Sequence, residues 1–386
     1  MTVAFKTFGC RLNRAEALDL EARHRAAGHE IVPLEGTVPR PDLIVVRGCS
    51  VTAKAQRDCE KEIERLRIRF PGARVLVTGC LPETETVPLG GTETVPVPLA
   101  TSRAYLKIQD GCSGTCAFCI VPQFRGRPVS VPFGDVLARA RAFLDAGFRE
   151  LVVTGCNLAL YRSEGRSLAA LLSALAEMET PSRHRVRLGS LEPGICDAAV
   201  LDAFATHPNI CRFIHLSLQS GSDTVLRRMN RPYAAETVAR FCSEAVRRLG
   251  PRLSLGADVI AGFPGETETD HGLTRDFLSR HVFSNLHVFP YSERPGTPAA
   301  TMDGALPRAI RLARAHELEA LGRAQRAAFA RTFLGQAVEV CVEKDGLHGW
   351  TAEYLPCKLK GPAERRSLVS VVVDRVEGDT LFSSAR

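Results

Sequence analysis

The sequence predicts an α/β protein with an N-terminal parallel α/β domain, a partial (β/α)6 barrel and a small C-terminal β-barrel. Two observations lead to this fold class. Apolar runs of strand length alternate with amphipathic helical stretches through residues 1–82 and 103–290, as is typical of parallel sheets. After residue 336 the pattern changes to short β-like runs separated by Gly and Pro, such as Ala337–Val340 and Leu368–Val373.

The N-terminal domain, placed at residues 1–97, repeats one strand ending three times. An apolar strand runs into a Gly-Cys pair that ends at Cys10, at Cys49 and at Cys80. Helical stretches at 14–27 and 53–69 lie between these strands. Since parallel strands share one carboxyl edge, where ligands gather in open α/β sheets, we expect the three cysteines to meet there.

The middle region, placed at residues 98–330, repeats strand and helix about six times, fewer than the eight units of a closed barrel. A Pro-, Gly- and Thr-rich stretch at 83–102 reads as the linker to it. We expect strands at 104–109, 150–154, 185–190, 213–219, 253–260 and 284–289. Helices are expected near 134–146, 167–178, 197–206, 234–248, 268–280 and 308–333. The C-terminal barrel is placed at 336–386.

Composition excludes several classes of protein. The 386 residues are 45% hydrophobic and 24% charged, which fits a folded chain with a sizeable core. We find no apolar run of membrane-spanning length and no signal peptide, and we expect a cytoplasmic protein. Thirteen cysteines in such a chain favour metal ligands or buried thiols over disulfides. The net charge of +7 fits a polyanionic partner without demonstrating one.

The sharpest motif is Cys112-Ser-Gly-Thr-Cys116-Ala-Phe-Cys119, which follows the first barrel strand. Three thiols this close together suit one soft-metal site. A structural zinc site needs four protein ligands, whereas three thiolates on a four-iron cluster leave one iron open for a cofactor. The alternatives are three unrelated cysteines or a zinc site completed by a distant histidine.

This motif resembles the CxxxCxxC loop of the radical S-adenosylmethionine enzymes. The resemblance implies that Cys112, Cys116 and Cys119 hold a [4Fe-4S] cluster whose open iron chelates S-adenosylmethionine. In that family, reductive cleavage of the sulfonium yields a 5′-deoxyadenosyl radical. Such a radical attacks a C–H bond that has no acidic proton.

Nearly the whole chain resembles the methylthiotransferases within that superfamily. The matching phrases include Phe5–Asn13, Gly48–Thr52, Leu216–Gly221, Asp258–Thr267 and Phe289–Ser292. The resemblance implies a second [4Fe-4S] cluster on Cys10, Cys49 and Cys80, which carries the sulfur to be inserted. It also implies two uses of S-adenosylmethionine, one as methyl donor to sulfur and one as radical source.

Within the family, the chain is most similar to the branch that acts on N6-threonylcarbamoyladenosine beside the tRNA anticodon. The phrases Thr7–Asn13 and Cys49–Thr52 favour that branch. Isopentenyladenosine in tRNA and an aspartate of a ribosomal protein remain alternative substrates, and a non-enzymatic zinc protein that binds RNA is the alternative from another class. The expected partners are tRNA and an unidentified electron donor. We expect a monomer.

Four further residues are predicted to contact the cofactor. Glu192 ends a barrel strand, and Arg231 could pair with a carboxylate, although a solvated Glu and a surface Arg are the plainer interpretations. Ser217 and Gln219 share one strand face with His215, which we expect to line the lumen. His215 itself is interpreted as a satisfied core histidine, and the role of Asp258 stays open.

Several features depart from the family pattern or allow two interpretations. Only 31 residues separate Cys80 from Cys112, Arg47-Gly48 stands where Asn-Thr is usual, and Cys156 replaces an aliphatic residue at a strand end. The C-terminal segment resembles the RNA-binding TRAM barrel, in which Trp350 either stacks on a base or packs in the core. A basic stripe at Arg308, Arg311 and Arg314 is interpreted as a solvated face or as a phosphate contact.

Overall fold

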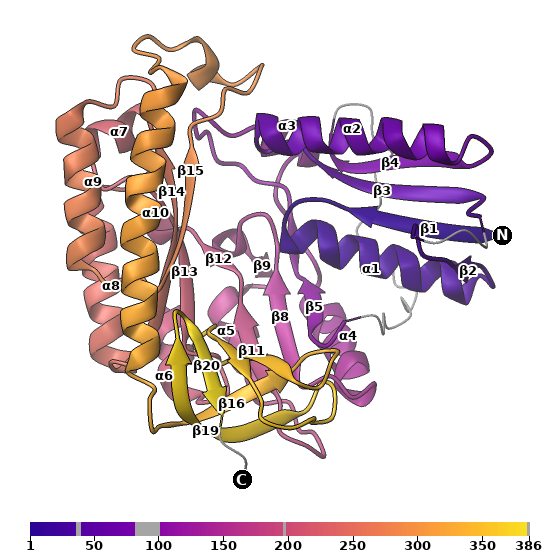
Figure 1. The fold of residues 1–386 in the computed structure, drawn as a ribbon. Coiled ribbons are helices and arrows are strands. Elements are labelled where there is room, and N and C mark those ends of the chain that lie inside the picture. Colours follow the sequence, from indigo (N-terminus) through magenta and orange to yellow (C-terminus); the bar gives the residue numbers. More distant parts are fainter. Residues whose placement is uncertain (36–39, 82–100, 196–197, 384–386) are drawn as a thin grey trace.

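A computed structural model describes residues 1–35, 40–81, 101–195 and 198–383. Of the predicted linker at 83–102, residues 83–100 lie outside this description. Figure 1 shows the predicted arrangement of an N-terminal α/β unit, a central half-barrel and a small C-terminal barrel beneath it. The α/β fold class is thereby confirmed. None of the described helices combines the length and hydrophobicity needed to cross a lipid bilayer.

The N-terminal unit is a four-stranded parallel sheet in the order β2-β1-β3-β4. Its strands are β1 (Thr2–Thr7), β2 (Glu30–Ile31), β3 (Leu43–Cys49) and β4 (Arg74–Cys80). Helices α1 (Arg11–Ala26) and α2 (Ala53–Arg69) cover opposite faces of this sheet (Figure 1). Because β3 lies between two strands and two helices, every one of its residues is buried. This explains its unbroken apolar run before Arg47.

Six parallel strand positions form the half-barrel, in two hydrogen-bonded groups, β11-β8-β5 and β12-β13-β14-β15. The strands are β5 (Ala104–Lys107), β8 (Glu150–Thr154), β11 (Arg185–Leu188), β12 (Ser190–Leu191), β13 (Phe213–Gln219), β14 (Ser254–Ala261) and β15 (Asn285–Pro290). The third predicted strand, 185–190, is interrupted at Gly189 and so contributes β11 to one group and β12 to the other.

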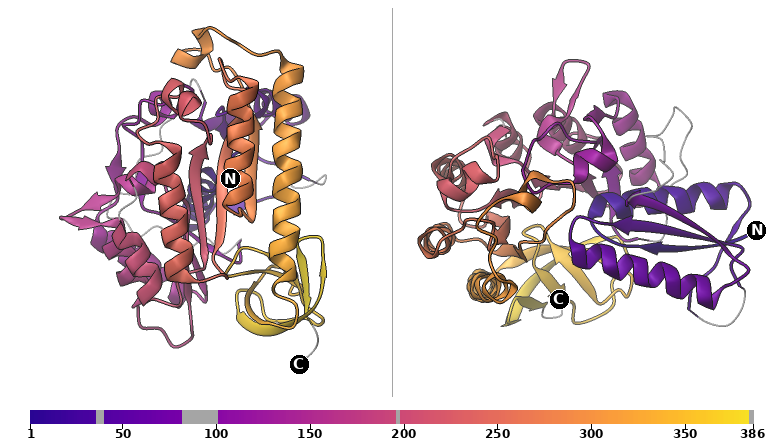
Figure 2. Two further views of the ribbon diagram at one scale, coloured as in Figure 1. Left: turned by 90° about the vertical axis from the view of Figure 1, so that its left-hand side faces the viewer. Right: turned by 90° about the horizontal axis from the view of Figure 1, so that it is seen from above.

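Long helices cover the outer side of the half-barrel (Figure 2). They are α4 (Phe133–Asp145), α5 (Leu168–Ala176), α6 (Ala198–Thr206), α8 (Ala235–Leu249), α9 (Glu268–Arg280) and α10 (Arg308–Arg331). All six were predicted to within a few residues. The short elements between the strands and helices were not predicted from the sequence: α3 (Val121–Arg125), α7 (Asp223–Arg228), η1 (Leu158–Leu160), η2 (Pro193–Ile195), η3 (Pro298–Thr301), β6 (Gln109–Asp110), β7 (Val129–Ser130), β9 (Arg162–Ser163) and β10 (Arg166–Ser167).

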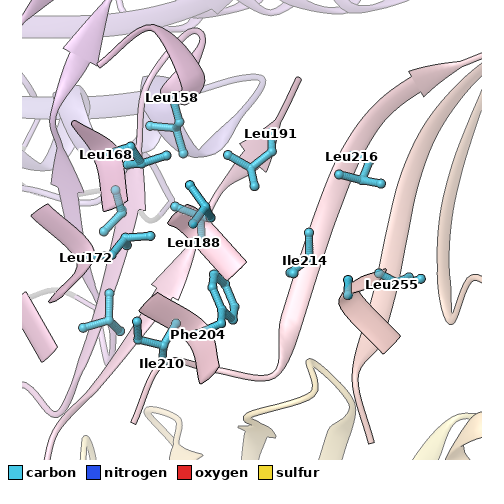
Figure 3. Close-up of a cluster of buried hydrophobic side chains, with 14 of the residues drawn as sticks. Leu158, Leu168, Leu172, Leu188, Leu191, Phe204, Ile210, Ile214, Leu216 and Leu255 are labelled. Carbon is cyan, nitrogen blue, oxygen red and sulfur yellow. The ribbon is translucent and has the colours of Figure 1, made fainter. Parts of the chain in front are cut away.

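The main hydrophobic core lies between the strands and these outer helices (Figure 3). Leu172 from α5 and Phe204 from α6 pack there with Leu188 and Leu216 from the strands. Alternate strand residues therefore point away from the helices, into the lumen of the half-barrel. Leu216 and Leu218 of β13 belong to this core.

The C-terminal unit is a closed five-stranded barrel in the order β16-β17-β18-β20-β19. The strands are β16 (Ala337–Val342), β17 (His348–Thr351), β18 (Pro356–Lys358), β19 (Leu368–Glu377) and β20 (Thr380–Ser383). A turn at residues 350–354, which we name the docking turn, contacts the amino ends of the core strands. Arg185 Nη2 donates to the Trp350 carbonyl over 2.6 Å, and Arg187 Nη2 donates to the Thr351 carbonyl over 2.7 Å.

Aromatic stacking completes this contact. The Tyr354 ring lies 4.8 Å from the Phe213 ring and 4.7 Å from the Trp350 ring, measured between centroids. Arg11, the first residue of α1, places its guanidinium 5.0 Å from the centre of the Tyr354 ring. All three units therefore meet at Tyr354. Trp350 is half-buried beside it and is not part of the hydrophobic core of the barrel, so both interpretations of this residue stay predictions.

Candidate functional site

The three Gly-Cys corners meet at the carboxyl edge of the N-terminal sheet. Cys49 and Cys80 are register partners on β3 and β4. Gly9 has a φ of +91°, and a Cβ there would lie 2.8 Å from the Cβ of Cys49, so only glycine permits this approach. Because Cys10 follows Gly9 directly, the first cysteine is held beside the other two.

A buried asparagine ties these strand ends together. Asn13 Nδ2 donates to the carbonyl oxygens of Phe8 over 2.9 Å and of Gly48 over 2.6 Å. Nearby, Ser50 Oγ is buried and has no hydrogen-bond partner among the described residues. Since buried hydroxyls are normally paired, this one fits a sulfide or thiolate acceptor held by the adjacent Cys49.

The second set of thiols lies on the loop after β6. Gly114 N–H donates to Cys112 Sγ over 3.2 Å. A Cβ on Gly114 would lie 3.2 Å from Cys112 Sγ and 3.6 Å from Cys116 Sγ, so the loop folds closely around this glycine. Cys119 N–H donates to the Cys116 carbonyl over 3.1 Å, which places the third thiol on the same turn.

Both sets fit a soft-metal cluster. The six cysteines are free thiols in the structure. Burial raises the pKa of Cys49 and that of Cys119 to about 11. A metal ligand must be deprotonated, and a bound cation supplies the charge that reverses such a shift. The donor set and the glycine-lined loops therefore suit an iron–sulfur cluster at each location.

Arg231 and Glu192, predicted separately as cofactor contacts, lie together beside the second set. Arg231 Nη1 donates to Cys116 Sγ over 2.8 Å, and its Nη2 lies 3.0 Å from Glu192 Oε1. Asn157 Nδ2 donates to Glu192 Oε2 over 2.7 Å. The arginine and the carboxylate are 4% and 11% exposed, so both interpretations of them as solvated surface residues are excluded.

Ser217 and Gln219 lie at the carboxyl end of β13, where a register shift interrupts the alternation on which their shared face was predicted. The Ser217 carbonyl accepts hydrogen bonds from Arg231 Nη2 over 3.3 Å and from the Tyr233 hydroxyl over 2.5 Å. Gln219 has a φ of +68° at a register shift in β13. His215 is 4% exposed and bonded to Asp258 over 3.0 Å, so its polar ring is satisfied as expected.

A buried ionic network joins the N-terminal unit to the half-barrel and reaches Cys80. Arg125 Nε donates to Cys80 Sγ over 2.9 Å, while its Nη1 donates to Asp110 and to Glu16 over 3.0 Å. Arg125 Nη2 donates to Asn13 Oδ1 over 2.8 Å. Glu16 also pairs with Arg47 and with Lys107. The atypical Arg47 is thus paired with Glu16, which also contacts Lys107 and Arg125 of the half-barrel.

Cys156, at the carboxyl end of β8, belongs to this network. Its Sγ–H donates to Asp110 Oδ1 over 3.2 Å. Lys107 and Arg125 outweigh the effect of burial and lower the pKa of Asp110 to about 2, so this carboxylate is a strong acceptor. Three hydrogen bonds, through Asp110 and Arg125, connect Cys156 to Cys80.

The structure corrects the interpretation of the basic stripe on α10. Arg314 is 9% exposed and lies 2.7 Å from Glu266 Oε1. Arg311 is 11% exposed and lies 2.6 Å from Glu293 Oε1. Arg311 and Arg314 therefore lie on the side of α10 that packs against the half-barrel, and acidic residues of the half-barrel neutralise their charges. These two residues do not form a solvated face.

Comparison with known protein families gives matches for the N-terminal unit and for the half-barrel. Residues 106–278 match the Radical SAM superfamily, and residues 2–95 match the Uncharacterized protein family UPF0004. The Threonylcarbamoyladenosine tRNA methylthiotransferase MtaB of Bacillus subtilis is 32% identical, over 93% of this chain and 90% of the relative. The tRNA-2-methylthio-N(6)-dimethylallyladenosine synthase of Cereibacter sphaeroides is also 32% identical, over 88% of this chain and 87% of the relative.

Solved structures share the fold. A radical S-adenosylmethionine methyltransferase from Kitasatospora setae, TsrM, superimposes with a TM-score of 0.54 at 15% identity, over 78% of this chain and 75% of that one. The superfamily implies a [4Fe-4S] cluster and S-adenosylmethionine. With relatives of this identity across nearly its full length, the chain belongs to the radical S-adenosylmethionine tRNA methylthiotransferases and is a transferase.

Proposed function

We propose that this enzyme attaches a methylthio group to C2 of the adenine in N6-threonylcarbamoyladenosine, next to the anticodon of tRNA. Relatives named for that nucleoside match at 29–32% identity over 92–97% of the chain. The phrases around Cys10 and Cys49 support the same branch. The observation that carries the proposal is the presence of two separate three-thiol sets, one at the carboxyl edge of the N-terminal sheet and one on the loop after β6.

Each thiol set has a role in this proposal. Cys112, Cys116 and Cys119 hold the cluster that binds S-adenosylmethionine, and Cys10, Cys49 and Cys80 hold the cluster that carries sulfur. When bound, the first cluster and its cofactor supply the carbon radical that an unactivated aromatic C–H bond requires. The chain itself supplies orientation, charge and exclusion of water.

The side chains around the second thiol set suit the charged end of the cofactor. Arg231 places a guanidinium within 2.8 Å of Cys116 Sγ, where it offsets thiolate charge and lies within reach of a carboxylate. Glu192 offers acceptor oxygens to an ammonium or a ribose hydroxyl. Ser217 and Gln219 line the adjoining end of β13. Three of these groups come from separate strands or loops, which fixes their relative positions.

The test is anaerobic reconstitution of the full chain followed by assay on anticodon stem-loop RNA that carries N6-threonylcarbamoyladenosine. Mass spectrometry of the nucleosides should show a gain of one methylthio group in place of hydrogen, together with 5′-deoxyadenosine. Iron and sulfide analysis should give two four-iron clusters per chain. Zinc in place of iron in either set, or no modified nucleoside, would refute the proposal.

Isopentenyladenosine in tRNA is the second candidate substrate, favoured by the similarity to the Cereibacter sphaeroides enzyme. A matched stem-loop RNA that carries isopentenyladenosine distinguishes the two candidates in the same assay. A ribosomal-protein aspartate is tested by adding ribosomes and analysing their proteins by mass spectrometry.

A further inference from the structure

One wall of the half-barrel lumen carries polar and aromatic groups that the roles above leave unused. His215, Asp258, His287 and Phe289 lie on the adjacent strands β13, β14 and β15. Asp258 is the register partner of His287, and Ile260 is the partner of Phe289. The intervening residues Ala257, Val259 and Val288 pack in the core against the outer helices, so the four groups face the lumen.

This wall, defined as His215, Asp258, His287 and Phe289, is flanked at both edges by residues that contact the surroundings of a thiol set. At the β13 edge, Arg231 links the Ser217 carbonyl to Cys116 Sγ. Beyond the β15 edge, Ser292 Oγ accepts a hydrogen bond of 2.9 Å from the backbone N–H of Ala53. Ala53 is four residues after Cys49. The wall therefore lies between contacts that lead toward each thiol set, where the proposed function requires the nucleobase to react.

The wall combines polar groups that can form hydrogen bonds with an aromatic ring on which a base can stack. Asp258 Oδ1 accepts hydrogen bonds from His215 Nε2 over 3.0 Å and from His287 Nδ1 over 3.2 Å. The buried His215 fixes the carboxylate, while the side chains of His287 and Asp258 remain 47% and 24% exposed. Phe289 is 41% exposed, an unusual state for a large apolar ring on a lumen face. Exposed aromatic rings serve as stacking surfaces for unpaired bases.

We propose that this wall binds the target adenosine, with the base stacked on Phe289 and its N6 substituent hydrogen-bonded by His287 and Asp258. The assignment rests on the proposed function and adds the means of substrate selection. A threonylcarbamoyl group carries N–H donors, a hydroxyl and a carboxylate, which match an imidazole–carboxylate pair. An isopentenyl group has no such atoms and forms none of these hydrogen bonds, so it gains no binding energy from the pair.

The test uses the full-length anaerobic enzyme and two stem-loop RNAs, one with N6-threonylcarbamoyladenosine and one with isopentenyladenosine. His287→Leu should lower the ratio of kcat/KM for the first RNA over the second by about tenfold to hundredfold, the effect of losing a hydrogen bond to a charged group. Phe289→Ala should weaken binding of both RNAs in fluorescence anisotropy by about tenfold, within the range for base–aromatic stacking. His207→Gln, next to Glu177 on the outer helices, is the matched control and should leave the ratio unchanged.

The outcomes separate the inference from the function on which it rests. A general folding defect lowers both rates and leaves the ratio unchanged, so the ratio reports recognition alone. If the wild-type enzyme prefers isopentenyladenosine, the proposed function is wrong. If it prefers N6-threonylcarbamoyladenosine but His287→Leu keeps the same ratio, the assignment of the wall is wrong. The triad has the composition of a cation site, so loss of a stoichiometric divalent metal on His287→Leu would also overturn the assignment.

Discussion

Replacing Arg125 with Met should loosen the N-terminal unit from the half-barrel. The Arg125 and Glu16 side chains are both 7% exposed, and the arginine donates to Cys80, Asn13, Glu16 and Asp110. Removing one partner of a buried ion pair costs about 3–5 kcal/mol. Because Glu16 and Asp110 both keep Lys107 as a partner, we expect the lower end, about 3 kcal/mol.

Hydrogen exchange measures this loss where it occurs. At about 1.4 kcal/mol per factor of ten, amides of α1 that exchange by separation of the two units should exchange about 150-fold faster. Arg139→Met is the matched control, since Arg139 pairs with Asp19 across the same interface but both side chains are more exposed. We expect less than about a fivefold change there, the effect of a pair worth up to about 1 kcal/mol. Equal acceleration in the two variants would refute the reasoning.

Three further predictions concern the thiol sets and the docking turn. A Cys112/Cys116/Cys119 triple Ala variant should keep about half of the iron of the wild type in anaerobic quantitation, because the other thiol set is separate; full loss of iron would contradict this. Tyr354→Ala should destabilise the docking turn by about 2 kcal/mol, roughly half the cost of removing a fully buried ring. The loss should appear as a red shift in the fluorescence of Trp350, the only tryptophan in the sequence. Tyr354→Phe, which keeps the ring, should show no red shift. Burial favours protonated Glu150, yet Arg187 and Arg185 hold its pKa well below the usual 4.5. The contribution of Glu150 to the stability of the docked state is therefore complete above its unfolded pKa of 4.5 and is lost only as the pH falls through its lower folded pKa. Trp350 fluorescence should therefore report undocking of the C-terminal barrel only in strong acid.

The sequence predicted the strands well because their patterns are local. The run at 150–154 and the run at 213–219 are strands with those bounds in the structure. The break at Gly189 was missed because it depends on how the sheet curves between two hydrogen-bonded groups. Short elements such as α7 and the β9–β10 hairpin were missed because a few residues give no periodicity to detect.

The site could be predicted only as far as its motifs reach. The six cysteines stand out because their spacing and their Gly-Cys corners are visible in the chain. Glu192 and Arg231 were predicted one by one, but their mutual pairing depends on the curvature of the sheet. The ion pair between Glu16 and Arg125 joins residues 109 positions apart, and neither residue carries a local signal for it. Asn157 and Tyr233 were missed for the same reason.

The docking turn affects the distance between the C-terminal barrel and the thiol sets. The C-terminal barrel is attached to the amino ends of the half-barrel strands through contacts of Arg185, Arg187 and Tyr354. These contacts hold the two units in a fixed relative position. If RNA binds the barrel, as the resemblance to the TRAM barrel implies, this contact fixes the distance between the bound RNA and the thiol sets. That fixed distance would then select which nucleotide can react.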